Sequence, residues 1–302
     1  MGIKASLTGY VELTRPHNLL ATALTTLVGW LSVGIFSHQE LLNPIYPLLT
    51  VCLVAAGGYV INDYFDAEVD SVNKPYRPIP SGRVSRRGAA VFGLLLTIIG
   101  VALSLTSGML TFGFAVFNAV LVFAYSYKIK EWGFIGNAVV AFQGAASIIY
   151  GALALAEYQG DVILMKYSLI PALYAFLLLL AREIVKTIED FEADSIRDVK
   201  SIPRVLGIPA AARISALIIG LVIAISPAPY LLTGYGYLYV ALVIPTDIML
   251  AYAIAVLIKL PSKKNPMERA GKLRSLLKVS IFLGILAFLL DLAVRYLGLF
   301  PA

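Results

Sequence analysis

Charged residues are scarce in this chain, and the scarcity limits what the protein can be. Only 14% of the 302 residues are charged, 59% are apolar, and the mean hydropathy is +0.84. A soluble domain carries about 25% charged residues, so a soluble fold is excluded. The apolar runs are continuous rather than alternating, which argues against a membrane β-barrel. The composition therefore predicts an all-α, polytopic membrane protein.

Cysteine and histidine are nearly absent. Cys52 is the single cysteine, so the chain forms no intrachain disulfide. Cys52 lies within an apolar run, and we interpret it as a small buried hydrophobic residue. The two histidines, His17 and His38, are too far apart in the sequence to make a metal site.

Long apolar runs are what the chain does have. A hydrocarbon core of about 30 Å is spanned by about 20 apolar residues in a helix. By that criterion the sequence predicts nine membrane spans, at residues 17–36, 43–65, 88–106, 109–127, 133–154, 166–188, 209–231, 236–259 and 276–299.

Positive charge is distributed unequally between the two predicted faces of the membrane. Of the 24 Lys and Arg residues, all but Lys166 and Arg295 fall on the side of the N-terminus. Because cationic loops favour the cytoplasm, we expect a cell-membrane protein with its N-terminus inside and its C-terminus outside. The net charge of +6 then reflects topology and contact with membrane lipids, and indicates no nucleic-acid partner.

Acidic residues gather in two short segments, NDYFDAEVD (62–70) and IEDFEADSIRD (188–198), which hold nine of the 18 Asp and Glu residues. Each segment ends an even-numbered span on the predicted cytoplasmic side, and both contain a D-x-E-x-D-S pattern. This repetition predicts a single transmembrane domain over 1–302, built from two four-helix halves (about 10–130 and 131–260) and a ninth helix at 272–300.

The spacing of these acids indicates their chemistry. Residues four apart lie on one face of a helix, so Asn62, Asp66 and Asp70 form one row. Asp190 and Asp194 form a second row, which Asp198 continues if the helix persists. Two rows of oxygen ligands suit Mg²⁺ bound together with a diphosphate. The alternative interpretation is a solvated helix end, which the double occurrence of the pattern disfavours.

Cations flank both acidic rows. Positive-inside topology explains most of them. Three lie nearest the rows and are the best candidates for diphosphate ligands: Arg77, Lys128 and Lys200.

At these residues the chain resembles the UbiA superfamily of intramembrane prenyltransferases. NDYFDAEVD is similar to that family's NDxxDxxxD motif and DFEAD to its DxxxD motif, and Arg15-Pro16 with Asn18 and the segment YSYKIK are also similar to family features. The resemblance implies nine helices in a ring around a central cavity with a polar cytoplasmic cap. It implies that an isoprenyl diphosphate ionises there with Mg²⁺ as cofactor and that an acceptor attacks the resulting carbocation.

The same resemblance assigns expected roles to individual residues. Metal and diphosphate ligands are expected at Asn62, Asp66, Asp70, Asp190 and Asp194. Phosphate contacts are expected from Lys128, Arg77 and Lys200, and Tyr125 is expected near the reacting carbon. Asp63 matches the motif but is turned by about 100° from its row, so its role is less defined.

The segment REIVKTIEDFEAD (182–194) is similar to the archaeal branch of the family that makes digeranylgeranylglyceryl phosphate. This implies transfer of a geranylgeranyl group to geranylgeranylglyceryl phosphate, forming the second ether bond of archaeal lipids. Arg15, Lys186 or Arg197 would then contact the acceptor's phosphate. An aromatic acceptor such as 4-hydroxybenzoate is the alternative, and a membrane transporter is a more distant one. No obligatory protein partner is evident.

The sequence leaves several questions open. It identifies no base for the acceptor hydroxyl, for which the departing diphosphate is one candidate, and it does not fix the prenyl chain length. Asp291 is placed to pair with Arg295 at i+4. Asp247 has no predicted role.

Overall fold

The computed structural model describes residues 3–36, 43–196 and 199–298, and in these ranges the chain forms helices and no strands. Nine of the described helical segments are long and apolar enough to cross a membrane, which confirms the predicted all-α, multi-pass fold. Their principal helices are α2 (Pro16–Phe36), α3 (Ile45–Asn73), α4 (Arg86–Leu103), α5 (Met109–Tyr127), α6 (Phe134–Tyr158), α7 (Leu169–Glu189), α10 (Ile208–Ile225), α12 (Tyr237–Lys259) and α13 (Pro266–Tyr296).

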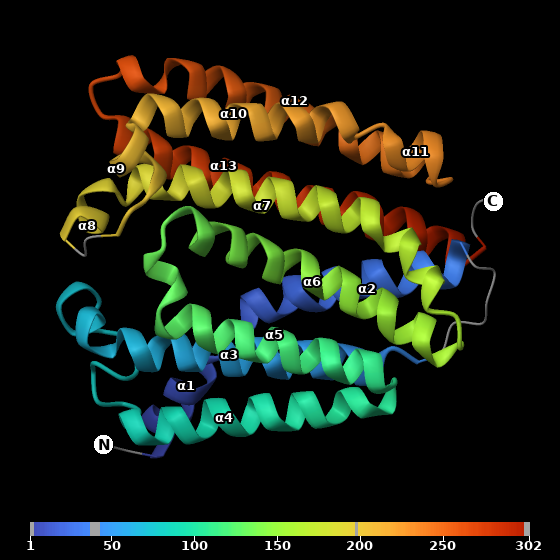
Figure 1. Ribbon diagram of the computed structural model, residues 1–302, viewed down its shortest axis with the longest axis horizontal. Coiled ribbons are helices and arrows are strands. Elements are labelled where there is room, and N and C mark those ends of the chain that lie inside the picture. Colours follow the sequence, from blue (N-terminus) through green and yellow to red (C-terminus); the bar gives the residue numbers. More distant parts are fainter. Residues whose placement is uncertain (1–2, 37–42, 197–198, 299–302) are drawn as a thin grey trace.

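Shorter helices connect or extend these spans (Figure 1). They are α1 (Ile3–Leu13), α8 (Phe191–Ile196), α9 (Ile202–Leu206) and α11 (Ala228–Leu232), with 3₁₀ turns η1 (Ser104–Thr106), η2 (Ile129–Glu131), η3 (Val162–Ser168) and η4 (Leu260–Ser262). Three long helices run furthest past their predicted spans: α3 continues to Asn73, α6 continues to Tyr158, and α13 begins at Pro266. Hydropathy identifies only the apolar part of a helix, which lies in the hydrocarbon core. The backbone hydrogen bonds of the helix can continue beyond it into the polar interface.

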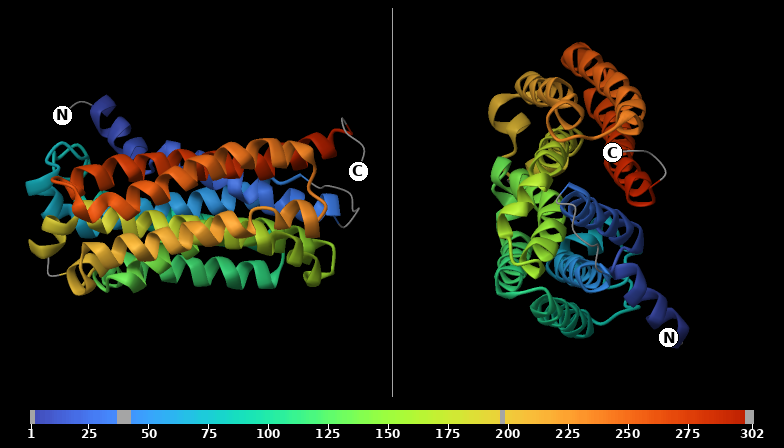
Figure 2. Two further views of the ribbon diagram at one scale, coloured as in Figure 1. Left: turned by 90° about the horizontal axis from the view of Figure 1, so that it is seen from above. Right: turned by 90° about the vertical axis from the view of Figure 1, so that its right-hand side faces the viewer.

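The spans follow one another around a ring. Each membrane helix packs against the next along the chain, from α2 to α13, and α13 packs back against α2. Additional contacts between α2 and α6 and between α7 and α13 cross the ring. The right-hand view in Figure 2 looks along the bundle and agrees with this order, and the left-hand view shows the helix axes running lengthwise. The division into two equivalent halves stays a prediction.

Small residues allow α2 and α6 to cross closely. A Cβ on Gly29 would lie 1.8 Å from the carbonyl oxygen of Ile148, and one on Gly151 would lie 2.1 Å from that of Thr26. Because lipid supplies no hydrophobic drive between helices, such backbone approach is a main source of packing energy in membranes. On the outer surface, large apolar side chains such as Val91, Ile98 and Leu217 are exposed, as lipid-facing positions are.

Two acidic side chains cap helices at the end of the bundle opposite the acidic motifs. Glu157 of α6 accepts hydrogen bonds from the backbone N–H groups of Leu110 and Thr111, at 2.8 and 2.7 Å. Asp291 of α13 does the same for Gly236 and Tyr239 at the start of α12, and it also pairs with Arg295 at 3.0 Å. Each carboxylate satisfies donors that a helix start leaves unpaired. Asp291 thus has a structural role in addition to its pairing with Arg295.

Candidate functional site

The first acidic motif lies entirely on the last turns of α3. The Nδ2 of Asn62 donates to Oδ2 of Asp66 at 2.9 Å, so these two side chains share a face, as their spacing predicts. Glu68 points elsewhere: its side chain is 81% exposed and pairs with Arg86 at 2.9 Å. In Figure 1 the end of α3 and the short helix α8 lie at the same end of the bundle.

Asp63 is the buried centre of a group of charged side chains. It accepts from Arg15 Nη2 at 2.5 Å and from Arg77 Nη1 at 3.3 Å. Arg77 Nη1 also lies 2.5 Å from Asp70 Oδ2. Burial lowers the pKa of Arg77, but the carboxylates of Asp63 and Asp70 outweigh this effect and raise the pKa above its ordinary value. Arg77 therefore stays charged and joins two carboxylates seven residues apart.

Arg15 reaches this group from the joint between α1 and α2. Its backbone has a φ of +51°, in the left-handed region that side chains rarely adopt. Its guanidinium lies 5.1 Å from the ring centroid of Tyr59 on α3. Asn18, one turn into α2, is half-buried beside the same tyrosine. The structure thus brings Arg15 and Asn18 to the first motif.

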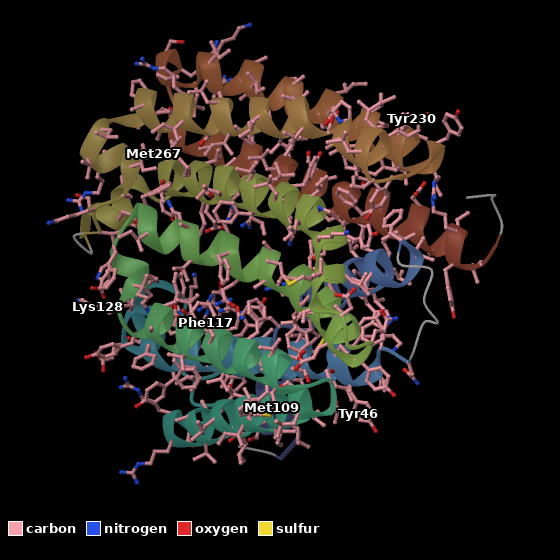
Figure 3. The ribbon with its side chains drawn as sticks, turned by 45° about the vertical axis from the view of Figure 1, so that its right-hand side comes forward. Tyr46, Met109, Phe117, Lys128, Tyr230 and Met267 are labelled. Carbon is pink, nitrogen blue, oxygen red and sulfur yellow. The ribbon has the colours of Figure 1, made fainter. Side chains whose placement is uncertain are left out.

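The loop between α5 and α6 carries two lysines, and Lys130 is the one that contacts the first motif directly. Lys130 Nζ lies 2.5 Å from Asp66 Oδ1. Lys128 pairs with Glu131 at 2.5 Å, its side chain is 58% exposed, and the hydrogen bond to Glu131 raises its pKa. Figure 3 shows Lys128 at the end of the molecule where Met267 lies. YSYKIK carries both lysines, but sequence reasoning did not single out Lys130.

The second acidic motif spans the end of α7 and the short helix α8. Asp190 follows the last residue of α7, and the backbone N–H of Asp194 donates to its carbonyl at 2.8 Å. Lys186 lies 3.8 Å from the Asp190 carboxylate. Arg204 donates to the carbonyls of Asp194 and Val199, at 3.1 and 2.7 Å, which fixes the turn after α8. Asp198 and Arg197 lie outside the described residues.

A close backbone contact joins the loop between α5 and α6 to the residues that follow the second motif. A Cβ on Gly133 would lie 1.9 Å from the carbonyl oxygen of Lys200, and Gly133 has a φ of +58°. Glycine is the residue that tolerates both conditions. Lys200 is exposed next to this contact. Tyr125 of α5 is half-buried, within electrostatic reach of Asp66 and of Glu183 on α7.

The acids fit a metal that is shared with a substrate. Among the described residues, no three Asp, Glu, His or Cys side chains gather closely enough to form a complete metal site. Instead, Asp66, Asp70 and Asp190 each pair with a lysine or arginine of the chain. Hard oxygen ligands of this kind suit Mg²⁺, which takes one or two carboxylates and completes its shell with water and substrate phosphates.

A family model described as "UbiA prenyltransferase family" matches residues 22–281. The chain belongs to the UbiA prenyltransferase family. This UbiA-family chain is 43% identical over 293 residues to a digeranylgeranylglyceryl phosphate synthase of Hyperthermus butylicus, covering 95% of this chain and 97% of the relative. It is 41% identical to the synthase of Saccharolobus solfataricus, with 94% of this chain and 97% of the relative covered.

Solved structures agree with this assignment. One described as "Structural and mechanistic insights into the biosynthesis of Digeranylgeranylglyceryl phosphate synthase in membranes" has a TM-score of 0.77 and 31% identity, covering 95% of this chain and 98% of its own. A UbiA homolog from Archaeoglobus fulgidus bound to GPP and Mg²⁺ has a TM-score of 0.59. Its identity of 18%, over 92% and 99% of the two chains, shows the shared fold alone. This UbiA-family protein is a membrane prenyltransferase.

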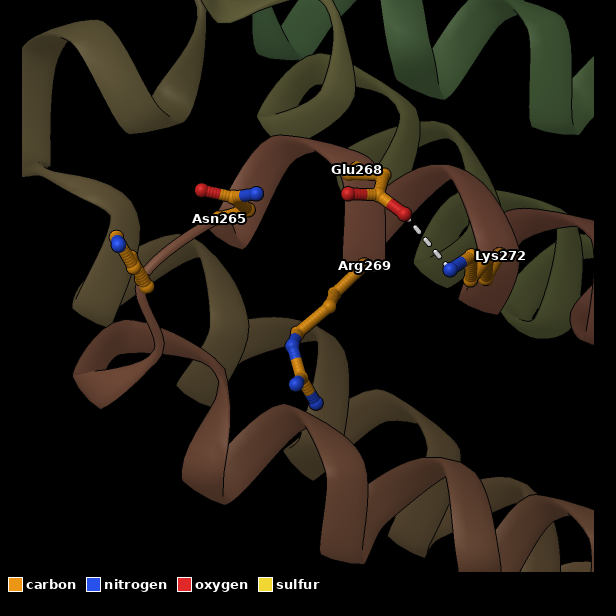
Figure 4. A pocket seen from close by; sticks show the side chains of 5 residues that line it. Asn265, Glu268, Arg269 and Lys272 are labelled. Atoms are coloured by element: carbon orange, nitrogen blue, oxygen red, sulfur yellow. Dashed lines mark hydrogen bonds and ion pairs between the residues drawn. The ribbon is translucent and has the colours of Figure 1, made fainter.

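Two pockets lie apart from the acidic motifs. One, of about 260 Å³ at the start of α13, is lined by Lys264, Asn265, Glu268, Arg269 and Lys272 (Figure 4). These side chains are exposed, and Lys272 pairs with Glu268 at 2.7 Å. The other, of about 280 Å³, lies where α10, α11 and α12 meet and includes Asp247, whose Oδ2 accepts from Ser226 at 2.5 Å. This contact gives Asp247 a partner but no catalytic role.

Proposed function

We propose that this enzyme transfers the geranylgeranyl group of geranylgeranyl diphosphate to the free hydroxyl of geranylgeranylglyceryl phosphate. The observation that carries the proposal is its similarity, over nearly the whole chain, to synthases named for the product of that reaction. The acidic motifs and their cations at one end of the bundle provide the chemistry that a diphosphate donor requires.

The donor's diphosphate would bind between the two motifs. Candidate ligands for Mg²⁺ are Asn62, Asp66, Asp70, Asp190 and Asp194, where the ion would neutralise charge on the departing diphosphate. Arg77, Lys128, Lys130 and Lys200 would contact the phosphates directly, and Asp63 would hold Arg15 and Arg77 in place. Tyr125 would face the reacting carbon.

The acceptor carries its own phosphate, which requires further cations. Arg15 and Lys186 lie beside the first and second motifs respectively. Asn18 lies one turn from Arg15, and Asp198 would continue the second row. The prenyl chains of both substrates would extend among apolar helices, which exclude water from the carbocation.

We place this site at the cytoplasmic face of the cell membrane. The support is the concentration of Lys and Arg at the end that carries the acidic motifs. The N-terminus would then lie inside and the C-terminus outside.

A competition assay tests the proposed acceptor. Purified full-length enzyme in lipid nanodiscs receives geranylgeranyl diphosphate, Mg²⁺ and equal concentrations of geranylgeranylglyceryl phosphate and 4-hydroxybenzoate. We expect diphosphate release and a diether phosphate as the main product. Predominant prenylation of 4-hydroxybenzoate would assign the enzyme to aromatic acceptors. Solute flux in liposomes without turnover on either acceptor would contradict the enzyme assignment altogether.

A further inference from the structure

A third acidic position lies deeper in the bundle than the two motifs. Glu183 of α7 is 7% exposed and belongs to neither motif. It precedes Asp190 by seven residues, which places it about 10 Å farther along the helix axis, at 1.5 Å per residue. A carboxylate at that depth in a membrane helix is costly, and such residues usually serve function.

Glu183 lies on the face of α7 that also carries Asp190 of the second motif. Leu179, Glu183, Lys186 and Asp190 recur at intervals of four, three and four residues, so they share one helix face. Leu179 is directed at α6, because its Cδ1 lies 2.1 Å from where a Cβ on Gly144 would be. Tyr125 on α5 is within electrostatic reach of both Glu183 and Asp66. Glu183 therefore lies below the acidic motifs on the side where α5 and α6 pack.

Arg182 compensates the buried charge. Its Nη1 donates to Oε1 of Glu183. The Arg182 Nε is also buried, and no hydrogen-bond partner for it is found among the described residues. The ion pair offsets part of the cost of burying the Glu183 carboxylate in the membrane, and the buried Arg182 Nε leaves a donor available to a group that binds beside the pair.

We propose that Glu183, oriented by Arg182, is the general base that accepts the proton of the acceptor's hydroxyl group. This inference rests on the proposed function. The bond between C1 of the donor and the diphosphate oxygen breaks, and its electron pair leaves with the diphosphate. The acceptor's oxygen forms the new bond to C1, and its proton passes to the Glu183 carboxylate.

Depth favours Glu183 over the motif acids for this role. The donor's prenyl chain extends into the apolar interior, so C1 lies on the hydrocarbon side of the diphosphate. An acceptor hydroxyl that approaches C1 from the hydrocarbon side would therefore lie at the same depth in the membrane as Glu183. In the proposed function the Asp66 and Asp70 carboxylates bind metal and diphosphate, which leaves Glu183 as the carboxylate free to take up the proton.

The test compares Glu183→Gln with wild-type enzyme, full length in nanodiscs. Glutamine keeps the size and hydrogen-bonding capacity of the side chain but does not take up a proton. We expect ether formation to fall about 100-fold, while the affinity for a non-ionising thiolo analogue of the donor stays within about twofold. Glu183→Asp should recover part of the ether formation. Asp247→Asn, which neutralises another membrane-embedded carboxylate, serves as the matched control and should behave as wild type.

Three results would overturn the inference. Ether formation by Glu183→Gln at a wild-type rate would leave the departing diphosphate as the base. A loss of analogue affinity parallel to the loss of ether formation would mean that Glu183 has only a structural role. Wild-type enzyme that prenylates carbon on 4-hydroxybenzoate, and not the alcohol, would instead overturn the proposed acceptor, and with it the need for a hydroxyl base.

Discussion

Lys130 Nζ lies 2.5 Å from Oδ1 of Asp66, so the loop between α5 and α6 supplies a cation to the acidic face of α3. Arg77 likewise lies 2.5 Å from Asp70, and Lys186, one turn before Asp190 on α7, lies 3.8 Å from its carboxylate. These pairs compensate carboxylates that would otherwise repel one another. A metal ion would bind the carboxylates of these pairs, and a diphosphate would bind their lysines and arginines. Binding of the donor should therefore separate the paired side chains.

Lys130 should therefore contribute more to donor binding than Lys128. Hydrogen bonds to charged groups are worth about 1.5–3 kcal/mol, so Lys130→Gln should raise the KM for the isoprenyl diphosphate by roughly tenfold or more. Lys128→Gln makes the same change two residues away and should raise this KM less, because Lys128 is already paired with Glu131. Steady-state kinetics at saturating acceptor measure the difference. A larger effect at Lys128 would instead support the expectation from the sequence, in which Lys128 is the phosphate ligand of this loop.

The two acidic motifs should each be indispensable for turnover. Asp66→Ala and Asp190→Ala both remove a candidate metal ligand without removing buried apolar contacts, so each should abolish diphosphate release while the protein stays folded. Glu68→Ala provides the control within the first motif, since Glu68 is exposed and paired with Arg86. Circular dichroism and a diphosphate-release assay distinguish inactivity from unfolding. Activity retained by either Asp variant would contradict a site made of both motifs.

The parts of this site that the sequence could predict are those that follow from helix geometry. Asn62 and Asp66 share a face because they are four residues apart on a continuous helix. Arg15 and Asp63 are 48 residues apart, and only the packing of α1 and α2 near the end of α3 brings them together. The choice between Lys128 and Lys130 depends on the 3₁₀ turn η2, whose backbone geometry the residue pattern does not specify.

The sequence also did not predict that a carboxylate on one helix caps the start of another. The i+4 spacing predicts the pair between Asp291 and Arg295, and the structure contains it. The hydrogen bonds from Gly236 and Tyr239 to Asp291 depend on α12 beginning beside the end of α13. Residue spacing predicts side-chain contacts within one helix, whereas these contacts depend on how α12 and α13 are placed relative to each other.

The crossing of α2 and α6 should tolerate no side chain at Gly29. A Cβ there would overlap the backbone of Ile148 at 1.8 Å, and backbone cannot move aside as a flexible side chain does. Gly29→Ala should therefore destabilise the protein by about 1–3 kcal/mol, as overpacking does. Gly113→Ala in α5 is the control, because nothing lies within 4 Å of its Cβ position. Thermal unfolding in detergent measures both, and equal unfolding temperatures would contradict the close crossing.

Asp291 should stabilise the fold without taking part in catalysis. It is 3% exposed and compensates both Arg295 and the first N–H groups of α12. Asp291→Ala leaves those donors and a largely buried arginine without their carboxylate, and breaking such a pair typically costs about 3–5 kcal/mol. The unfolding temperature should fall accordingly, whereas Glu268→Ala, which breaks an exposed pair with Lys272, should leave it unchanged.

Measuring the activity of the Asp291→Ala enzyme distinguishes a structural role of Asp291 from a catalytic one. Asp291 lies near the C-terminal end of α13, at the opposite end of the bundle from α8 and the acidic motifs (Figure 1). Asp291→Ala enzyme that is still folded at low temperature should therefore keep the wild-type turnover number and the wild-type KM for the donor. A reduced turnover number in fully folded protein would show that Asp291 influences the reaction site from the far end of the bundle, and an unaltered unfolding temperature would show that the cap contributes nothing to stability.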